Sequence, residues 1–179
     1  MLTQTLLATT AAGTSLLLNP TVASADESKT VVVAGATGQT GRRILERLAS
    51  QPNLSVVAGV RNVDKATKSL SESSTVVRGA MVQKVASVDT AAVELKHLDV
   101  VADDASTLAS TLNGASALVI AVGFVPSNPL KMASAAHEVD NVGTCKLIDA
   151  AKSAGIKKIV MVSSILTNGR NWGQGKSPG

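Results

Sequence analysis

Three glycines at three-residue spacing, Gly35, Gly38 and Gly41, directly follow the short apolar run at residues 31–34. A strand that enters such a turn and then a helix leaves backbone N–H groups at the positive end of the helix dipole, where a pyrophosphate binds. One glycine makes the turn, one lets the backbone approach the pyrophosphate, and one lets the helix pack closely on the strand. The segment therefore predicts nucleotide binding; the alternative is a glycine-rich turn with packing duties only. The candidate residues are Gly35, Thr37, Gly38, Gln39, Thr40 and Gly41.

The end of the second expected strand distinguishes the two nicotinamide dinucleotides. A site for NAD(H) places a carboxylate there, which accepts a hydrogen bond from the ribose 2′-hydroxyl. This chain has Arg61 and Asn62 instead, and its next acidic residue is Asp64. A guanidinium binds a phosphate through two charge-assisted hydrogen bonds, so Arg61 favours NADP(H) over NAD(H), with Arg42 or Arg43 as a second contact. The alternative for Arg61 is a solvated surface charge.

The composition disfavours several other functions. The 179 residues include one phenylalanine, one tryptophan and no tyrosine, which is too few aromatic side chains for a single-stranded nucleic-acid binder or a membrane barrel. The net charge is +4, and the basic residues are scattered, so we expect no nucleic-acid partner. A single cysteine, Cys145, and two isolated histidines, His97 and His137, give little support to a metal site.

Short apolar runs alternate with helical patterns along the chain, which is typical of a parallel sheet covered by helices. The expected strands are residues 30–34, 54–60, 93–100, 115–122 and 157–162, and the expected helices are 38–50, 63–70, 104–112 and 130–154. Gly155 is expected to end the last helix. Residues 71–92 are rich in Ser and Thr and predict only a strand fragment at 75–77 within an irregular excursion. We expect a doubly wound, Rossmann-like α/β sheet with strand order 3-2-1-4-5 and helices on both faces.

Residues 1–25 contain no charged side chain and end in Ala-Ser-Ala. That triplet matches the small-x-small pattern of a leader-peptidase site. The Leu-, Ala- and Thr-rich stretch before it is too short and too polar for a membrane span, so we expect no integral membrane segment. We interpret residues 1–25 as a targeting leader, the alternative being a disordered extension, and residues 26–179 as the folded domain.

Six motifs follow one another in order: VVVAGATGQTGRR at residues 31–43, AGVRNVDKA at 58–66, LDV at 98–100, ALVIAVGF at 117–124, VDNVGTCKLIDAAKSAG at 139–155 and KIVMVSSILTNG at 158–169. Together they resemble the atypical short-chain dehydrogenase/reductases, that is, the NmrA-like and plastid NAD(P)-binding Rossmann proteins. The similarity looks closest to a plant and algal chloroplast subgroup, which suits a leader. It implies a plastid location, with the cytoplasm as the alternative.

The resemblance also implies roles for residues beyond the glycine segment. Asp99 and Val100 match the place of adenine contacts, and Ala121 and Gly123 match the place where the nicotinamide ribose lies against backbone. Asn141 matches an asparagine that supports the active site. The alternatives are a loop cap for Asp99 and a helix-surface amide for Asn141.

The catalytic groups of the family are only partly present. Ser163 and Ser164 match the serine that polarises a carbonyl, while the tyrosine and lysine that would follow are absent, so the domain is expected to be incomplete at its C-terminus. Without a partner donor, strand-end hydroxyls bonded to backbone are the better interpretation of these serines. Two functions remain: the cofactor-binding part of an NADPH-dependent oxidoreductase acting on a small organic substrate, or a non-catalytic NADP(H)-binding sensor or scaffold.

Overall fold

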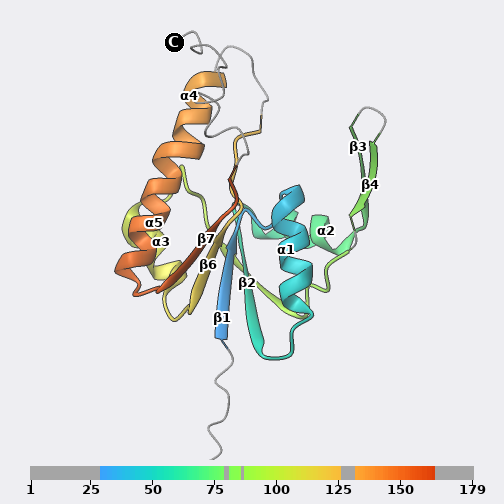
Figure 1. Ribbon diagram of the computed structural model, residues 1–179, viewed down its shortest axis with the longest axis horizontal. Coiled ribbons are helices and arrows are strands. Elements are labelled where there is room, and N and C mark those ends of the chain that lie inside the picture. The colour runs from blue at the N-terminus through green and yellow to red at the C-terminus, as the bar shows by residue number, and fades with distance from the viewer. Residues whose placement is uncertain (1–28, 79–80, 86, 126–131, 164–179) are drawn as a thin grey trace, which may run out of the picture.

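A five-stranded parallel sheet forms the centre of the chain in a computed structural model, which describes residues 29–78, 81–85, 87–125 and 132–163 (Figure 1). Its strands are β1 (Lys29–Ala34), β2 (Leu54–Val60), β5 (Val93–His97), β6 (Ala117–Ile120) and β7 (Lys158–Met161). They pair in the order β5-β2-β1-β6-β7, and every pairing is parallel. In order of the expected strands this is 3-2-1-4-5, so the predicted topology is confirmed. The expected leader, residues 1–25, lies outside the described residues.

Helices cover both faces of this sheet, as a doubly wound fold requires. One face carries α1 (Gln39–Ala49) and α2 (Val63–Ser71). The other carries α3 (Ala105–Leu112) and α5 (Thr144–Ser153). The carboxyl ends of the strands converge at one edge of the sheet, beside the start of α1 (Figure 1). Residues that follow β1, β2, β5 and β6 are therefore brought near one another there.

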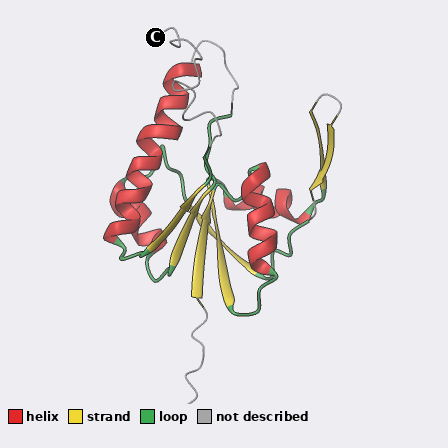
Figure 2. Ribbon diagram, viewed as in Figure 1, coloured by secondary structure: helices red, strands yellow, loops and turns green. Residues whose placement is uncertain are grey.

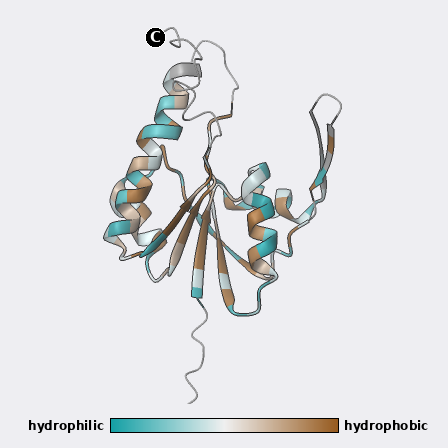
Figure 3. Ribbon diagram, in the orientation of Figure 1, coloured by the Kyte–Doolittle hydropathy of each residue, from teal (hydrophilic) through white to brown (hydrophobic). Residues whose placement is uncertain are grey.

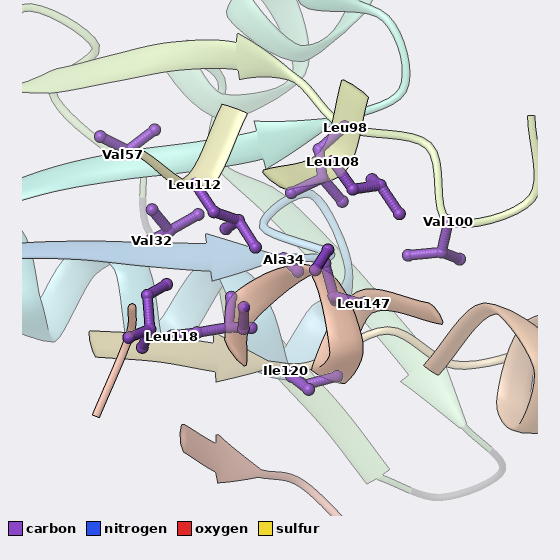
Figure 4. Close-up of a cluster of buried hydrophobic side chains, with 13 residues drawn as sticks. Val32, Ala34, Val57, Leu98, Val100, Leu108, Leu112, Leu118, Ile120 and Leu147 are labelled. Atoms are coloured by element: carbon purple, nitrogen blue, oxygen red, sulfur yellow. The ribbon is translucent and has the colours of Figure 1, made fainter. Parts of the chain in front are cut away.

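The core is aliphatic, as the composition predicts, and the strands stand out as the most apolar part of the fold (Figure 3). Between the sheet and the α3/α5 layer, leucines from the helices meet valine, leucine and isoleucine from the strands (Figure 4). Leu108, Leu112, Leu118 and Leu147 are completely buried there. Burying each such side chain contributes about 2 kcal/mol to stability, so this layer holds the carboxyl edge of the sheet in place.

A second sheet, which the sequence did not predict, projects from the end of α2 (Figure 2). It is an antiparallel hairpin of β3 (Ser74–Arg78) and β4 (Met81–Val85). The expected fragment at residues 75–77 is part of β3, but the expected irregular excursion is wrong, because the two strands pair with each other. Val82 in β4 is two-thirds exposed, so the hairpin's hydrogen bonds, rather than burial in the main core, define this element.

The long helix expected at residues 130–154 is interrupted. Its described part consists of α4 (Met132–Ala136), a π-helical segment (His137–Gly143) and α5. Thr144 donates its hydroxyl to the Val139 carbonyl at 3.3 Å, and Gly143 lies where a Cβ would be 2.8 Å from Val100 Cγ2. The wider turn thus lets the helix backbone approach the end of the sheet. Gly155 ends α5 with φ of +76°, so the predicted glycine terminus is confirmed.

Candidate nucleotide-binding site

The glycine segment between β1 and α1 is shaped by two glycines that no other residue could replace without movement. Gly35 has φ of +78°, and a Cβ there would lie 2.7 Å from the Ala121 carbonyl oxygen. A Cβ on Gly41 would lie 2.1 Å from the Gly35 carbonyl oxygen. The first glycine therefore makes the turn against the end of β6, and the second brings α1 close to the turn.

Gly38 and its neighbours form the start of α1. A Cβ on Gly38 would meet only the Gly35 carbonyl oxygen, at 3.3 Å. Gly38 is the N-cap residue, no side chain caps the helix, and no acidic residue lies in its first turn. The backbone N–H groups of Gln39, Thr40 and Gly41 thus form the positive end of the helix dipole, and no carboxylate of the first turn neutralises it. Such a helix end favours a bound phosphate.

Arg42, one residue further along α1, is bonded to the end of α2. Its guanidinium donates to the carbonyls of Ser69 at 2.9 Å and Leu70 at 3.1 Å, and also to that of Glu72. Arg42 is buried, with 4% of its surface exposed. Arg42 therefore holds the C-terminal end of α2 against α1.

A hollow of about 500 Å³ lies at the end of β2. It is lined by Thr37, Val60, Arg61, Asn62, Lys65, Ala66 and Ser69. A neighbouring hollow of about 470 Å³, which shares Thr37, Lys65 and Ser69, extends towards the base of the hairpin. The first hollow therefore brings the glycine segment and the end of β2 together around two basic side chains, Arg61 and Lys65, while Arg42, Lys68 and Glu72 line the second.

Lys65 is a site residue that the sequence reasoning missed. The Asn62 side chain accepts a hydrogen bond from the Lys65 backbone N–H at 2.8 Å, which makes Asn62 the N-cap of α2. A residue at the third helical position after a cap lies close to the strand that precedes the helix. The asparagine directly after Arg61 is thus the sequence signal that could have found Lys65.

After the end of β5, the Asp99 side chain accepts hydrogen bonds from the backbone of its own loop. Its Oδ1 accepts from the backbone N–H groups of Val101 at 2.9 Å and Ala102 at 3.2 Å. Val100 is buried in the core beside Gly143. This is the loop-cap alternative for Asp99, and the proposed adenine contacts of Asp99 and Val100 stay predictions.

His97, the last residue of β5, lies beside the same loop. Its Nε2 is 3.0 Å from Asp103 Oδ1, and its Nδ1 is 3.1 Å from the Arg61 carbonyl oxygen. The hydrogen bond to Asp103, opposed in part by desolvation, raises the pKa of His97 above its ordinary value. The ends of β2 and β5 are therefore linked through an imidazole.

The residues after β6 are open on one side. Ala121 contacts the glycine turn through its backbone, and Gly123 has no atom within 4 Å of the place of a Cβ. The Phe124 backbone N–H donates to Asp140 Oδ1 at 2.8 Å, which ties this loop to the π-helical segment. Backbone is thus accessible where the nicotinamide ribose is expected.

Three further candidates lie on the π-helical segment and after β7. Asn141 is exposed on the π-helical segment, where its Nδ2 is 3.3 Å from His137 Nδ1 and its Oδ1 accepts from the Cys145 thiol at 3.7 Å. Ser163 is exposed after β7, and Ser164 lies outside the described residues. Their assigned roles stay predictions.

Within the described part of the chain, no group of His, Cys, Asp and Glu side chains could hold a metal ion. None of the helices described is long and apolar enough to cross a bilayer.

Comparison with known proteins places the chain among chloroplast proteins. An uncharacterized chloroplastic protein of Arabidopsis thaliana is 37% identical over 155 residues, which are 87% of this chain and 48% of that protein. The chloroplastic protein TIC 62 of Pisum sativum is 31% identical over 157 residues, which are 83% of this chain and 27% of that protein. The chain thus spans about half the length of the first relative and about a quarter of the second.

Solved structures share the fold at low identity. The structure of MoeE5 in complex with UDP-glucose and NAD aligns with a TM-score of 0.54 at 18% identity, covering 76% of this chain and 36% of that one. Uronate dehydrogenase from Agrobacterium tumefaciens aligns with a TM-score of 0.50 at 23% identity, covering 76% and 41%. A family model described as NmrA-like matches residues 27–176. The chain belongs to the NmrA-like family.

Proposed function

We propose that this chain binds NADP(H) and forms the cofactor-binding part of an NADPH-dependent oxidoreductase that acts on a small organic substrate. The observation that carries the proposal is the hollow at the end of β2. Arg61 and Lys65 line it together with Thr37 of the glycine segment, and no carboxylate is among the residues that line it. A ribose 2′-hydroxyl would lack an acidic acceptor there, whereas a 2′-phosphate would meet two cations.

The pyrophosphate would lie at the start of α1. Gly38 leaves space there, and the amides of the first turn supply hydrogen-bond donors. The bound cofactor would supply or accept a hydride, while this chain's own residues hold its phosphates and orient its two ends. Membership of the NmrA-like family and a shared fold with an NAD complex support a nicotinamide dinucleotide.

The test is a comparison of NADPH and NADH affinities by titration calorimetry. NADPH is expected to bind more tightly, and Arg61→Asp is expected to weaken NADPH by about 10- to 100-fold, the equivalent of one lost charge-assisted contact. Lys157→Asp is the matched control. This lysine is exposed and directly precedes β7, which is an outer strand of the sheet three places away from β2. Equal affinities for the two dinucleotides, or equal losses in the two variants, would contradict the proposal.

A second candidate is an NADP(H)-binding module that turns over no substrate. It would use the same hollow and the same start of α1, because these residues account for cofactor binding under either function. The full-length protein would be assayed for NADPH oxidation with a panel of quinones and carbonyl compounds. Turnover supports the oxidoreductase; tight NADPH binding without turnover supports the module.

We also propose a plastid location. The chloroplastic relatives and the leader pattern of residues 1–25 support it. A fluorescent protein fused after residue 25 is expected to enter plastids in plant cells, and a cytoplasmic signal would contradict this.

A further inference from the structure

The His97 imidazole makes two hydrogen bonds that its neutral form cannot make together. Nδ1 faces the Arg61 carbonyl oxygen at 3.1 Å, and Nε2 faces Asp103 Oδ1 at 3.0 Å. A carbonyl and a carboxylate only accept hydrogen bonds, so each ring nitrogen must donate a proton. A neutral imidazole carries one N–H, and only the imidazolium carries two. The two distances therefore fit a protonated His97.

Through these bonds His97 joins the segment of Arg61, which lines the proposed site, to the loop after β5. Arg61 begins the turn after β2, and Asp103 lies in the loop after β5. Asp103 Oδ2 in turn accepts from the Asp99 backbone N–H at 2.7 Å. Lys146 on α5 donates its ammonium group to the carbonyls of Asp103 and, at 3.2 Å, of Val101. The β5 loop is thus anchored to α5, and His97 is the side chain that extends this anchorage to Arg61.

We propose that the His97 imidazolium is a positioning residue that holds Arg61 for the 2′-phosphate, so that NADP(H) affinity depends on the protonation of His97. The inference rests on the proposed function and goes beyond it by adding pH regulation of the same site. When His97 loses a proton, one of its two bonds is lost. The Leu98 N–H still donates to the Val60 carbonyl at 2.9 Å, so the two strand ends stay paired and what weakens is the link between Asp103 and the Arg61 carbonyl.

The groups around His97 favour the charged form. Asp103, whose side chain is 11% exposed, and Asp99 provide negative charge from the β5 loop. On β5 itself, Lys96 is paired with Glu94 at 3.3 Å. The helix α3 contributes no ionisable residue and only the Thr111 hydroxyl, which donates to the His97 carbonyl at 3.3 Å. The charged residues of α2, which packs on β5, are Asp64, Lys65 and Lys68.

The sign of the effect follows from these surroundings. Because the hydrogen bond to Asp103 raises the pKa of His97 above its ordinary value of 6.5, the bridge forms on the acidic side of the elevated pKa and is lost as the pH rises through it. Cofactor affinity should therefore fall on the alkaline side of pH 6.5. By linkage, binding of NADPH should in turn raise the pKa of His97.

The experiment compares the chain with His97→Gln. Glutamine has a similar reach and can donate one hydrogen bond but does not titrate. NADPH affinity would be measured by calorimetry from pH 6 to pH 9, and NADH affinity in parallel. The unsubstituted chain is expected to lose about five- to tenfold more NADPH affinity over this range than the variant, which corresponds to one hydrogen bond. Titration of the 2′-phosphate itself, near pH 6, affects both proteins equally.

Identical pH profiles in the two proteins would overturn the inference while leaving NADP(H) binding intact. An equal pH effect on NADH would also overturn it, because NADH has no 2′-phosphate. Failure of NADPH to bind at any pH would refute the proposed function, and the inference with it.

A second measurement does not depend on the folding of His97→Gln. The pKa of His97 would be read from its ring proton resonances by NMR, with and without NADPH. We expect it above 6.5 in the free chain, higher with NADPH, and lower in Asp103→Asn. An unchanged pKa on addition of NADPH would refute the coupling.

Discussion

Replacing Arg42 by methionine tests whether this buried arginine stabilises the fold or binds the cofactor. The guanidinium donates to three carbonyls at the C-terminal end of α2, those of Ser69, Leu70 and Glu72. Methionine preserves most of the apolar stem and the helix propensity of α1 but removes all of these donors. We expect Arg42→Met to destabilise the folded chain.

The expected loss of stability in Arg42→Met depends on which hydrogen-bond partners the three carbonyls keep. Leu70 also accepts from the Val88 backbone N–H at 2.8 Å, so its carbonyl keeps one partner in the variant. The bonds to Ser69 and Glu72 are only partly buried, so water can replace the guanidinium there. Because of this compensation we count each of the three bonds at about 1 kcal/mol, the typical net value of a hydrogen bond, which gives a loss of about 3 kcal/mol. For a domain of this size, that lowers Tm by about 6–12 °C.

The assay is thermal unfolding followed by circular dichroism, with NADPH affinity measured on the same samples. Arg47→Met is the matched control, because Arg47 is an exposed arginine on the same helix and its loss should change the free energy of unfolding by less than about 0.5 kcal/mol. Equal Tm values in the two variants would refute the structural role. If Arg42→Met kept its Tm but lost discrimination between NADPH and NADH, the arginine would instead be a phosphate ligand.

Two further predictions concern the glycine segment and the cap of α3. Gly41→Ala places a Cβ 2.1 Å from the Gly35 carbonyl oxygen. We expect the free energy of unfolding in urea to fall by about 1–2 kcal/mol, after the gain in helix propensity, and NADPH to bind more weakly. Gly123→Ala is the control, since its Cβ would meet no atom within 4 Å, and it should unfold like the original chain. Hydrogen bonds from the backbone and hydroxyl of Thr107, and then from Ser106, lower the pKa of Asp104 to about 2. Because that pKa lies below the unfolded value of 3.8, the stability from this cap is present above pH 4 and lost towards pH 2. Asp104→Asn keeps an acceptor but does not titrate, so the fall in Tm between pH 5 and pH 3 should be smaller in this variant; an equal fall would contradict the assignment.

The parallel sheet could be predicted because its strands are nearly continuous apolar runs. Residues 31–34 and 56–60 are buried on both faces of the sheet, and burial of that kind leaves a signal that does not depend on register. The hairpin has no such signal. Val77 pairs with Val82, and Val82 is 67% exposed whereas Val85, at the end of β4, is buried, so only the base of the hairpin reaches the core. Local pairing of two short strands outside a core was therefore not visible in the sequence.

The interruption of the long helix was equally hidden, for a different reason. A π-helical segment preserves the apolar spacing on either side to within one residue, and His137–Gly143 contains no proline and only one glycine, Gly143. Its cause is tertiary: Gly143 packs against Val100, and Asp140 accepts the Phe124 N–H from the loop after β6. Both partners lie far away along the chain, so only the folded structure identifies them.

The basic residues show most directly where reasoning from residue type ends. Arg42, Arg61 and Lys65 are all suited to a phosphate by charge. The sequence favours Arg61 by its place after the second expected strand, but it does not show how Arg42 is engaged or that Lys65 lies beside Arg61. The folded chain separates them, because the last carbonyls of a helix are also acceptors that lack partners and attract a guanidinium. Arg42 is engaged by those of α2, whereas Arg61 and Lys65 line the hollow beside the glycine segment. Competition between a helix end and a ligand for the same cation thus decides which arginine is structural. Arg42→Met is therefore expected to lower the stability of the fold, whereas Arg61→Asp is expected to weaken NADPH binding.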